Sequence, residues 1–297
     1  MRIVDPHHHL WDRDLHSYPW LAVPTVSGLV GDTTPLCRNY LLADLKADAA
    51  GLELVKSVHL QAEIAHELAV EETRWLQGIA DAPGSGGFPH GIVAYADLSE
   101  PEVDSTLAAH AGFANTRGIR QILNRHPNPG VSFVDRDYMR EEQWQQGFGR
   151  LRAHGLSFDM QLYAPQMPDG AATARRHPDT QIVVNHTGMP LDRDPDGLAA
   201  WRSGMQALAA CPNVAVKISG LGMVMHDWTA ERIRPLVLET IEVFGTDRCL
   251  FASNFPVDRL FSDYATLWNA FDQIIAGFST AERNALFHDN AARVYRL

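Results

Sequence analysis

The sequence predicts a (β/α)8 barrel, or TIM barrel, formed as a single domain over residues 1–297. Eight short apolar runs rich in β-branched residues are spread along the chain, and segments with helical spacing lie between them. Strands that alternate with helices form right-handed crossovers and a parallel sheet. Eight such units in 297 residues favour a closed barrel. An open doubly wound sheet is the alternative, but no glycine-rich phosphate turn follows the first run.

The eight runs are predicted to be buried strands. Their apolar stretches are nearly continuous, which is typical of parallel strands that are covered on both faces. In chain order the predicted strands span residues 2–6, 55–61, 91–98, 117–123, 156–163, 180–186, 213–219 and 248–254.

The segments between these runs carry the apolar periodicity of helices. In residues 141–154, Trp144, Phe148 and Leu151 recur at i, i+4 and i+7, and Gly155 follows where a C-terminal glycine is expected. Further helices are expected over residues 66–81, 101–111, 170–177, 198–210 and 229–244.

Residues 17–39 depart from this alternation. The segment is long, contains proline and is only weakly periodic. We therefore expect an extended first βα loop that lies over the mouth of the barrel.

Composition excludes several classes of protein. The formal net charge is −11, which argues against a nucleic-acid groove, and no apolar run is long enough to span a membrane. The first residues are too polar for a signal peptide. Cys37, Cys211 and Cys249 show no CxxC spacing, so no disulfide framework is expected. We expect a cytoplasmic protein.

The histidines of the first strand indicate chemistry. In Asp5-Pro6-His7-His8-His9, alternation along the strand points His7 and His9 the same way and His8 the opposite way. Two imidazoles at the carboxyl end of a barrel strand can bind one divalent metal where active sites lie. The alternative is a solvated, histidine-rich start of the chain.

A third histidine strengthens this interpretation. His186 closes the sixth predicted strand, again at its carboxyl end. Three neutral imidazoles with an open position suit Zn²⁺ or a similar ion that lowers the pKa of a bound water. The alternative role for His186 is that of a hydrogen-bonded core residue.

Motifs along the whole chain carry a family resemblance. They are IVDPHHHLWD at the start, HLQAE at 59–63, RGIRQ at 117–121, FDMQLY at 158–163, VVNHTGMP at 183–190, VKISGL at 216–221 and LFASNFPVD at 250–258. In this order the motifs resemble the amidohydrolase superfamily, and within it the amidohydrolase-related, metal-dependent TIM-barrel hydrolases. The chain is similar in particular to the branch of 2-pyrone-4,6-dicarboxylate lactonase and the fucono- and rhamnono-lactonases.

This resemblance implies metal ligands at His7, His9 and His186, holding one divalent ion such as zinc. Arg120 stands where a carbamylated lysine would bridge two metals, which favours one metal or none. Asn254 stands where the superfamily has an aspartate that acts as ligand and general base. Because an amide cannot accept a proton at neutral pH, that role passes to Asp258, Glu63, a histidine or a metal hydroxide. Asn254 and Asp258 are therefore grouped with the histidines as candidate catalytic residues.

Other polar residues near the predicted strand ends are candidates for substrate binding. The guanidinium of Arg120 offers a fork that matches a carboxylate. The alternative for each candidate is a structural role inside the barrel. The remaining candidates are Gln61, Glu63, Gln161 and Lys217.

We therefore expect a hydrolase that acts on a small cyclic ester, possibly an anionic lactone, through a histidine cluster that binds one divalent metal. A metal-independent lactonase and a non-oxidative decarboxylase of the same superfamily are the alternatives. A binding protein that has lost catalysis is a further rival, because of Asn254. We expect a small-molecule substrate, no nucleic-acid or membrane partner, and possibly a homo-oligomer.

Overall fold

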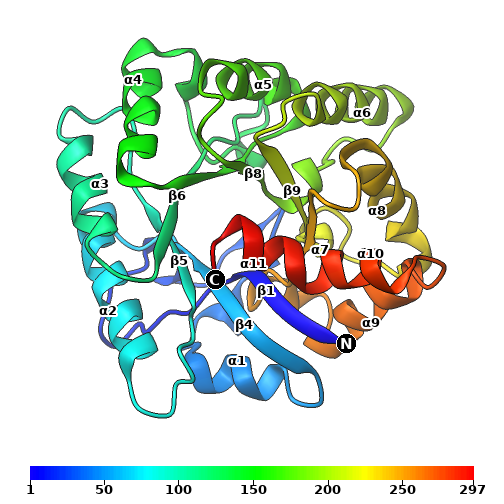
Figure 1. Ribbon diagram of the computed structural model, residues 1–297, viewed down its shortest axis with the longest axis horizontal. Helices are drawn as coiled ribbons and strands as arrows, with labels where there is room; N and C mark the ends of the chain where they lie inside the picture. Colours follow the sequence, from blue (N-terminus) through cyan, green and yellow to red (C-terminus); the bar gives the residue numbers. More distant parts are fainter.

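The computed structural model describes all 297 residues and confirms the predicted barrel. Eight parallel strands form one sheet, in which each strand pairs with the next along the chain, and helices surround it (Figure 1). The strands are β1 (Arg2–His8), β4 (Glu53–Leu60), β5 (Gly91–Tyr95), β6 (Thr116–Ile122), β7 (Ser157–Gln161), β8 (Ile182–Val184), β9 (Val214–Ile218) and β10 (Cys249–Phe251).

The helices cover the outside of the sheet. Six of them, α2 to α6 and α8, lie within or close to the segments expected from the sequence, whereas α1, α7 and the helices after β10 were not expected. They are α1 (Leu42–Asp48), α2 (Ala69–Asp81), α3 (Val103–Ala111), α4 (Glu142–Arg150), α5 (Met167–Arg176), α6 (Pro195–Ala209), α7 (Leu221–Val224), α8 (Ala230–Phe244), α9 (Tyr264–Ile274), α10 (Thr280–Asn284) and α11 (Asn290–Val294).

Contacts between the first and last strands close the barrel. The backbone N–H of Asn254 donates to the carbonyl oxygen of His7 (2.7 Å). The buried carboxylate of Asp5 accepts hydrogen bonds from the backbone N–H (3.0 Å) and hydroxyl (2.6 Å) of Ser253. These bonds fix the end of β1 relative to the turn after β10, and both segments carry predicted site residues.

Side chains of the strands alternate between two cores. In β9, Val214 and Val216 face outward into the large cluster beneath the helices, whereas Ala215 belongs to a smaller cluster inside the barrel. Lys217 shares the inward face with Ala215, because alternate residues of a strand share a face. Helix α11 lies next to β1 (Figure 1), and Tyr295, which follows this helix, belongs to the inner cluster.

The first βα loop lies over the mouth, as the sequence predicts. It contains a short hairpin of β2 (Val26–Ser27) and β3 (Gly31–Asp32). Leu29 of this hairpin belongs to a third apolar cluster together with Met223 and Val257, which follow β9 and β10. The mouth is therefore partly roofed by apolar side chains. No helix in the structure is long and apolar enough to cross a membrane.

Several predicted strands end earlier than expected, and in two of them this affects a site residue. β8 ends at Val184 and β10 at Phe251, so His186 and Asn254 lie in turns beyond the strands. Both residues have a left-handed backbone, with φ of 54° and 59°, which an extended strand cannot accommodate. Simple alternation therefore does not set the direction of these two side chains.

Candidate active site

A cavity of about 180 Å³ opens at the carboxyl ends of the barrel strands. Apolar side chains of the surrounding loops complete its wall. TIM-barrel active sites lie at this face, which makes the cavity the candidate active site. Its polar lining comes from the ends of six strands and consists of His9, Glu63, Arg120, Gln161, His186 and Asn254.

The backbone at this mouth is strained. Left-handed conformations of this kind cost about 1–3 kcal/mol each and collect at functional sites. Gly220 is also left-handed, and a Cβ there would lie 2.5 Å from Nδ1 of His186, so the glycine makes room for that ring. Five of the six non-glycine residues with positive φ lie at the mouth, namely Glu63, His186, Thr187, Met189 and Asn254.

His9 presents a hydrogen-bond acceptor to the cavity. Its Nδ1 lies 2.8 Å from the carbonyl oxygen of Leu60, which can only accept, so Nδ1 carries the proton. Burial, assisted by the charge of Arg120, lowers the pKa of His9 well below its ordinary value. The ring is therefore neutral and its Nε2 keeps a lone pair. This nitrogen lies 3.4 Å from Oδ1 of Asn254.

His186 is a neutral ring at the same cavity. Its Nδ1 lies 3.1 Å from the hydroxyl of Ser219, which can donate to a ring nitrogen or accept from its N–H. Burial, assisted by Arg120 and Lys217, lowers the pKa of His186 well below its ordinary value. When the Ser219 hydroxyl donates, the ring proton is on Nε2, and His186 then brings a donor to the cavity at which His9 presents an acceptor.

Lys217 sets the protonation of His7 beneath the cavity. Its Nζ lies 3.5 Å from Nδ1 of His7. Burial lowers the pKa of Lys217 to about 8, so the amine is still protonated at neutral pH. An ammonium only donates, which leaves the proton of His7 on Nε2. That Nε2 is buried without a partner, and the ring centroids of His7 and His186 lie 4.5 Å apart.

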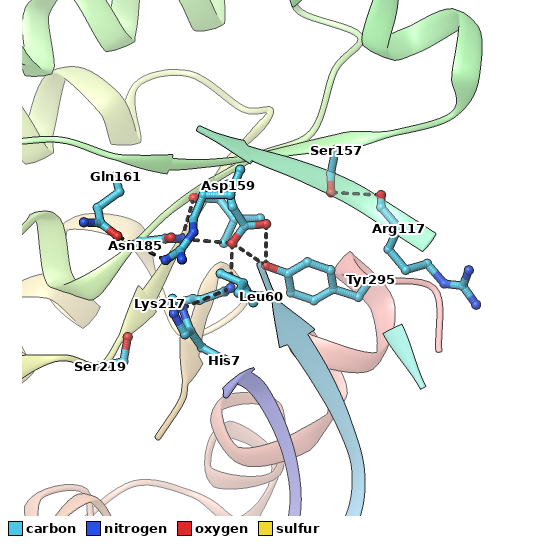
Figure 2. A network of polar contacts seen from close by, with 12 residues as sticks. His7, Leu60, Arg117, Ser157, Asp159, Gln161, Asn185, Lys217, Ser219 and Tyr295 are labelled. Atoms are coloured by element: carbon cyan, nitrogen blue, oxygen red, sulfur yellow. Dashed lines mark hydrogen bonds and ion pairs between the residues drawn. The ribbon is translucent and has the colours of Figure 1, made fainter. Parts of the chain in front are cut away.

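A buried network holds Lys217 in place (Figure 2). Its Nζ lies 2.6 Å from Oδ1 of Asp159, and both side chains are fully buried. Tyr295 donates its hydroxyl proton toward the two oxygens of this carboxylate (2.9 and 3.0 Å), and Asn185 Nδ2 donates to one of them (2.9 Å). Removing one partner of a buried ion pair costs about 3–5 kcal/mol. The network therefore holds the ammonium firmly beneath His7.

Arg120 is anchored at the floor of the cavity with donors to spare. One terminal nitrogen donates to the carbonyl oxygen of Gln61 (2.6 Å) and the other to Oε1 of Gln161 (3.2 Å). Its Nε has no partner, although the side chain is buried. A guanidinium has five N–H donors, so three are not engaged by protein groups, and the side chain lines the cavity.

Asn254 connects His9 to a second carboxyl group. Its Nδ2 donates to Oδ1 of Asp258 (2.9 Å), which directs its own Oδ1 toward Nε2 of His9. Burial raises the pKa of Asp258 to about 7, against hydrogen bonds from Asn254 and the backbone of Gly222 that lower it. This arrangement suits an ionised Asp258, which accepts from the Asn254 amide. When His9 is protonated, its Nε2–H can donate to the amide oxygen of Asn254.

Glu63 is the carboxylate that lines the cavity. Its backbone N–H donates to Oε1 of Gln61 (2.7 Å), and Gln61 Nε2 in turn donates to the Glu63 carboxylate. These reciprocal bonds hold Glu63 in its left-handed conformation. Gln61 itself lies behind the cavity wall and positions both Glu63 and Arg120.

A three-histidine metal centre does not fit these side chains. A ligand nitrogen needs a lone pair, yet His7 faces the Lys217 ammonium with Nδ1 and carries its proton on Nε2, so it offers no free nitrogen to a metal. No group of three histidine, cysteine, aspartate or glutamate side chains is arranged so that it could hold a metal ion. The positive charges of Lys217 and Arg120 also act on His7 and oppose a further cation. The metal-ligand set therefore stays a prediction from the sequence, and the chemistry below depends on the protein's own groups.

The structure brings most of the predicted site residues together. Those named above as polar lining meet in one cavity, while the other four lie behind its wall. Lys217 lies behind the wall because it is located within β9 and not beyond the end of the strand. Gln61 and Lys217, expected to contact substrate, are placed to support other side chains instead. The four residues behind the wall are His7, Gln61, Lys217 and Asp258.

The apolar residues that line the cavity were not predicted from the sequence. Trp20 and Val30 come from the first βα loop, Phe133 from the loop after β6 and Met223 from α7. Loop residues follow no periodic pattern, so only their size and apolar character mark them. The indole N–H of Trp20 donates to the carbonyl oxygen of Ala62 (2.8 Å), which fixes that ring at the rim.

Comparisons with known proteins identify the family of the chain. A family model described as Amidohydrolase matches residues 4–297, which confirms the resemblance seen in the sequence motifs. The chain is 50% identical to an uncharacterized protein, y4mH, of Sinorhizobium fredii, over 99% of this chain and 98% of that protein. It is 28% identical to an L-fucono-1,5-lactonase of Burkholderia multivorans, over 99% of this chain and 96% of the lactonase.

Solved structures give the same result. An amidohydrolase of Burkholderia multivorans, crystallised with bound HEPES and with bound zinc, superimposes with a TM-score of 0.82 at 27% identity. The superposition covers the whole of both chains.

Proposed function

Because the chain belongs to the amidohydrolase family and is a hydrolase, we propose that its substrate is a small lactone, which it opens by adding water to the ester. One observation carries the proposal. His9 presents an acceptor nitrogen to a cavity that the neutral ring of His186 also lines, and we assign to His186 the donor role through Nε2–H. Ester hydrolysis needs both a group that takes a proton from water and a donor to the carbonyl oxygen.

His9 is the general base of the proposed reaction. Its Nδ1–H is fixed on the carbonyl of Leu60, so Nε2 takes the proton as water attacks the carbonyl carbon. The resulting imidazolium donates to Oδ1 of Asn254, and the Asp258 carboxylate behind this amide stabilises the positive charge. Asn254 therefore assists the base, although it cannot be the base itself.

The negative charge that develops on the carbonyl oxygen is stabilised by donors. In the proposed reaction the Ser219 hydroxyl donates to Nδ1 of His186, so His186 offers Nε2–H at the cavity, and Nε2–H of His7 lies beneath it. When the tetrahedral intermediate collapses, the ring C–O bond breaks and the leaving oxygen takes the proton from His9. The product is a hydroxy acid, which ionises and releases one proton to solvent at neutral pH.

Arg120 binds the oxygen-rich end of the substrate in this proposal. The protein has a net charge of −11, so an anionic lactone is repelled at long range unless the mouth supplies positive charge. Arg120 supplies that charge with free N–H donors in planar geometry. We infer that the preferred lactone carries a carboxylate or a comparable group of oxygens at this end.

Zinc or another divalent ion, where a relative binds one, would supply Lewis acidity at the carbonyl. The proposed reaction draws that polarisation from N–H donors instead. Lactone hydrolysis can therefore be tested independently of any metal requirement.

Purified protein tests the function through a panel of five- and six-membered lactones, acidic and neutral, followed by proton release. Ring opening at a rate well above buffer supports the proposal. Release of carbon dioxide from an aromatic or unsaturated acid, with no ring opening of any lactone, would favour the decarboxylase alternative. Binding of lactones without turnover would favour a protein that has lost catalysis.

A further inference from the structure

We propose, building on the proposed function, that the lactone carries an apolar alkyl or aryl arm, which leaves the catalytic cavity and lies in a second, outer cavity under the first βα loop. The outer cavity has a volume of about 290 Å³. Trp20, Val30 and Phe133 line both it and the catalytic cavity, so the two are neighbours across these side chains.

The catalytic cavity is divided into a polar floor and an apolar rim. Its hydrogen-bonding groups come from strand ends, whereas Trp20, Val30 and Phe133 come from loops above them. A lactone that presents its ester to His9 and His186 therefore directs its far side toward apolar surface. A polyhydroxylated ring would place its outer hydroxyls against groups that cannot hydrogen-bond to them.

The outer cavity has no charged lining and few free polar groups. The hydroxyl of Thr33 donates to the carbonyl oxygen of Thr25 (3.1 Å), and Ser27 Oγ accepts from the backbone of Val30 (2.9 Å). Ser132 donates to the carbonyl oxygen of Val134 (2.8 Å). These hydroxyls are engaged within their own loops, so the cavity presents mainly hydrocarbon to a ligand.

Exposed apolar side chains also gather at this entrance. Val23 is 65% and Phe133 is 47% exposed, and both line the outer cavity. Contiguous exposed apolar surface marks a binding site when it rims a cavity of this kind. An apolar arm would cover this surface while the ester lies at the catalytic residues.

Neutral δ-lactones with alkyl arms of increasing length test the inference. We expect kcat/KM to rise by up to about fourfold for each methylene that becomes buried, until the outer cavity is filled. Polyhydroxylated gluconolactone should be hydrolysed more slowly than the alkyl lactones. A flat or falling dependence on arm length, or a preference for gluconolactone, would overturn the inference and leave the lactonase proposal intact.

Two matched variants locate the effect. Val23→Asp places a carboxylate in the outer cavity, whereas Val26→Asp makes the same change on an exposed residue that lines neither cavity. Val23→Asp should flatten the dependence on arm length, and Val26→Asp should preserve it. Equal effects of both variants, or a change of oligomeric state in both, would assign the patch to contacts between copies and refute the inference.

Binding separates this inference from the proposed function. Alkyl-substituted δ-lactams resist hydrolysis, and their affinity can be measured by calorimetry without turnover. If no lactone is hydrolysed, the proposed function fails, but affinity for the lactams that increases with arm length still supports the apolar arm. Lactam affinity that is independent of arm length would overturn it.

Discussion

The stability of the folded protein should depend on pH through Asp258, and Asp258→Asn should remove this dependence. Burial raises the pKa of the carboxyl group from 3.8 to about 7. As the pH rises, the unfolded chain loses this proton before the folded protein does. The free energy of unfolding therefore falls between about pH 4 and pH 7 and is level above that range.

The size of this effect follows from the two pKa values. They differ by about three, and each pKa unit corresponds to about 1.4 kcal/mol, so the ionised carboxyl destabilises the folded protein by ~4 kcal/mol. Asp258 is 2% exposed, so solvent screens the charge little. Between pH 5 and pH 8, about 3 kcal/mol of this penalty should develop.

Urea unfolding at pH 5, 6, 7 and 8, followed by tryptophan fluorescence, measures this contribution. The stability difference between wild type and Asp258→Asn should change by about 3 kcal/mol over the range, in favour of the variant at high pH. Glu72→Gln is the matched control. Burial raises the pKa of Glu72 to about 8, so its contribution should continue to change up to that pH.

Parallel stability curves for wild type and Asp258→Asn would refute this reasoning. A constant offset between them means that Asp258 has the same pKa in the folded and unfolded states. The carboxylate would then reach solvent, and its proposed stabilisation of the His9 imidazolium would lose its basis.

Further substitutions and metal removal test other parts of the account. Arg120→Lys should raise the KM for an acidic lactone about tenfold and leave the KM for a neutral lactone nearly unchanged, because an ammonium lacks the planar fork. An equal loss of activity on both lactones, together with a lower Tm, would show that Arg120 has a structural role instead. Asn254→Asp should add a carboxylate limb to the pH–rate profile. Asn254→Ala should lower kcat less than His9→Gln does. A larger loss of kcat in Asn254→Ala would contradict the assignment of His9 as the base and Asn254 as its assistant. Chelation with EDTA should leave activity in place, since His7 faces the Lys217 ammonium and offers no free nitrogen to a metal. Activity that is lost and then restored by Zn²⁺ would contradict this.

The order of strands and helices could be predicted because it depends on local sequence. Each strand contains its own apolar run, and parallel pairing with the next strand follows from the intervening helix. The ends of β8 and β10 could not be predicted, because left-handed turns at His186 and Asn254 interrupt runs that look continuous in sequence. Helix α1 has only seven residues, too few for a clear periodicity. The single-domain organisation and cytoplasmic location stay predictions.

It was easier to predict which residues form the candidate site than which nitrogen of each histidine carries a proton. Strand ends converge in any parallel barrel, so residues such as Arg120 and Gln161 could be placed at the mouth from the sequence. The protonated nitrogen of each histidine instead depends on partners distant in the chain, such as Leu60 for His9 and Lys217 for His7. The sequence contains no local signal for these contacts, and they decide whether the rings suit a metal.

Proton release and carbon dioxide release, recorded in one reaction with wild type and His9→Gln, test the central claim most directly. The account predicts one equivalent of acid for each lactone opened, no carbon dioxide, and a kcat that falls by about 10²–10⁴ in His9→Gln. His226→Gln is the control, because His226 lies outside the catalytic cavity, and it should retain the wild-type rate. Unchanged turnover in His9→Gln, or carbon dioxide release without ring opening, would contradict the account.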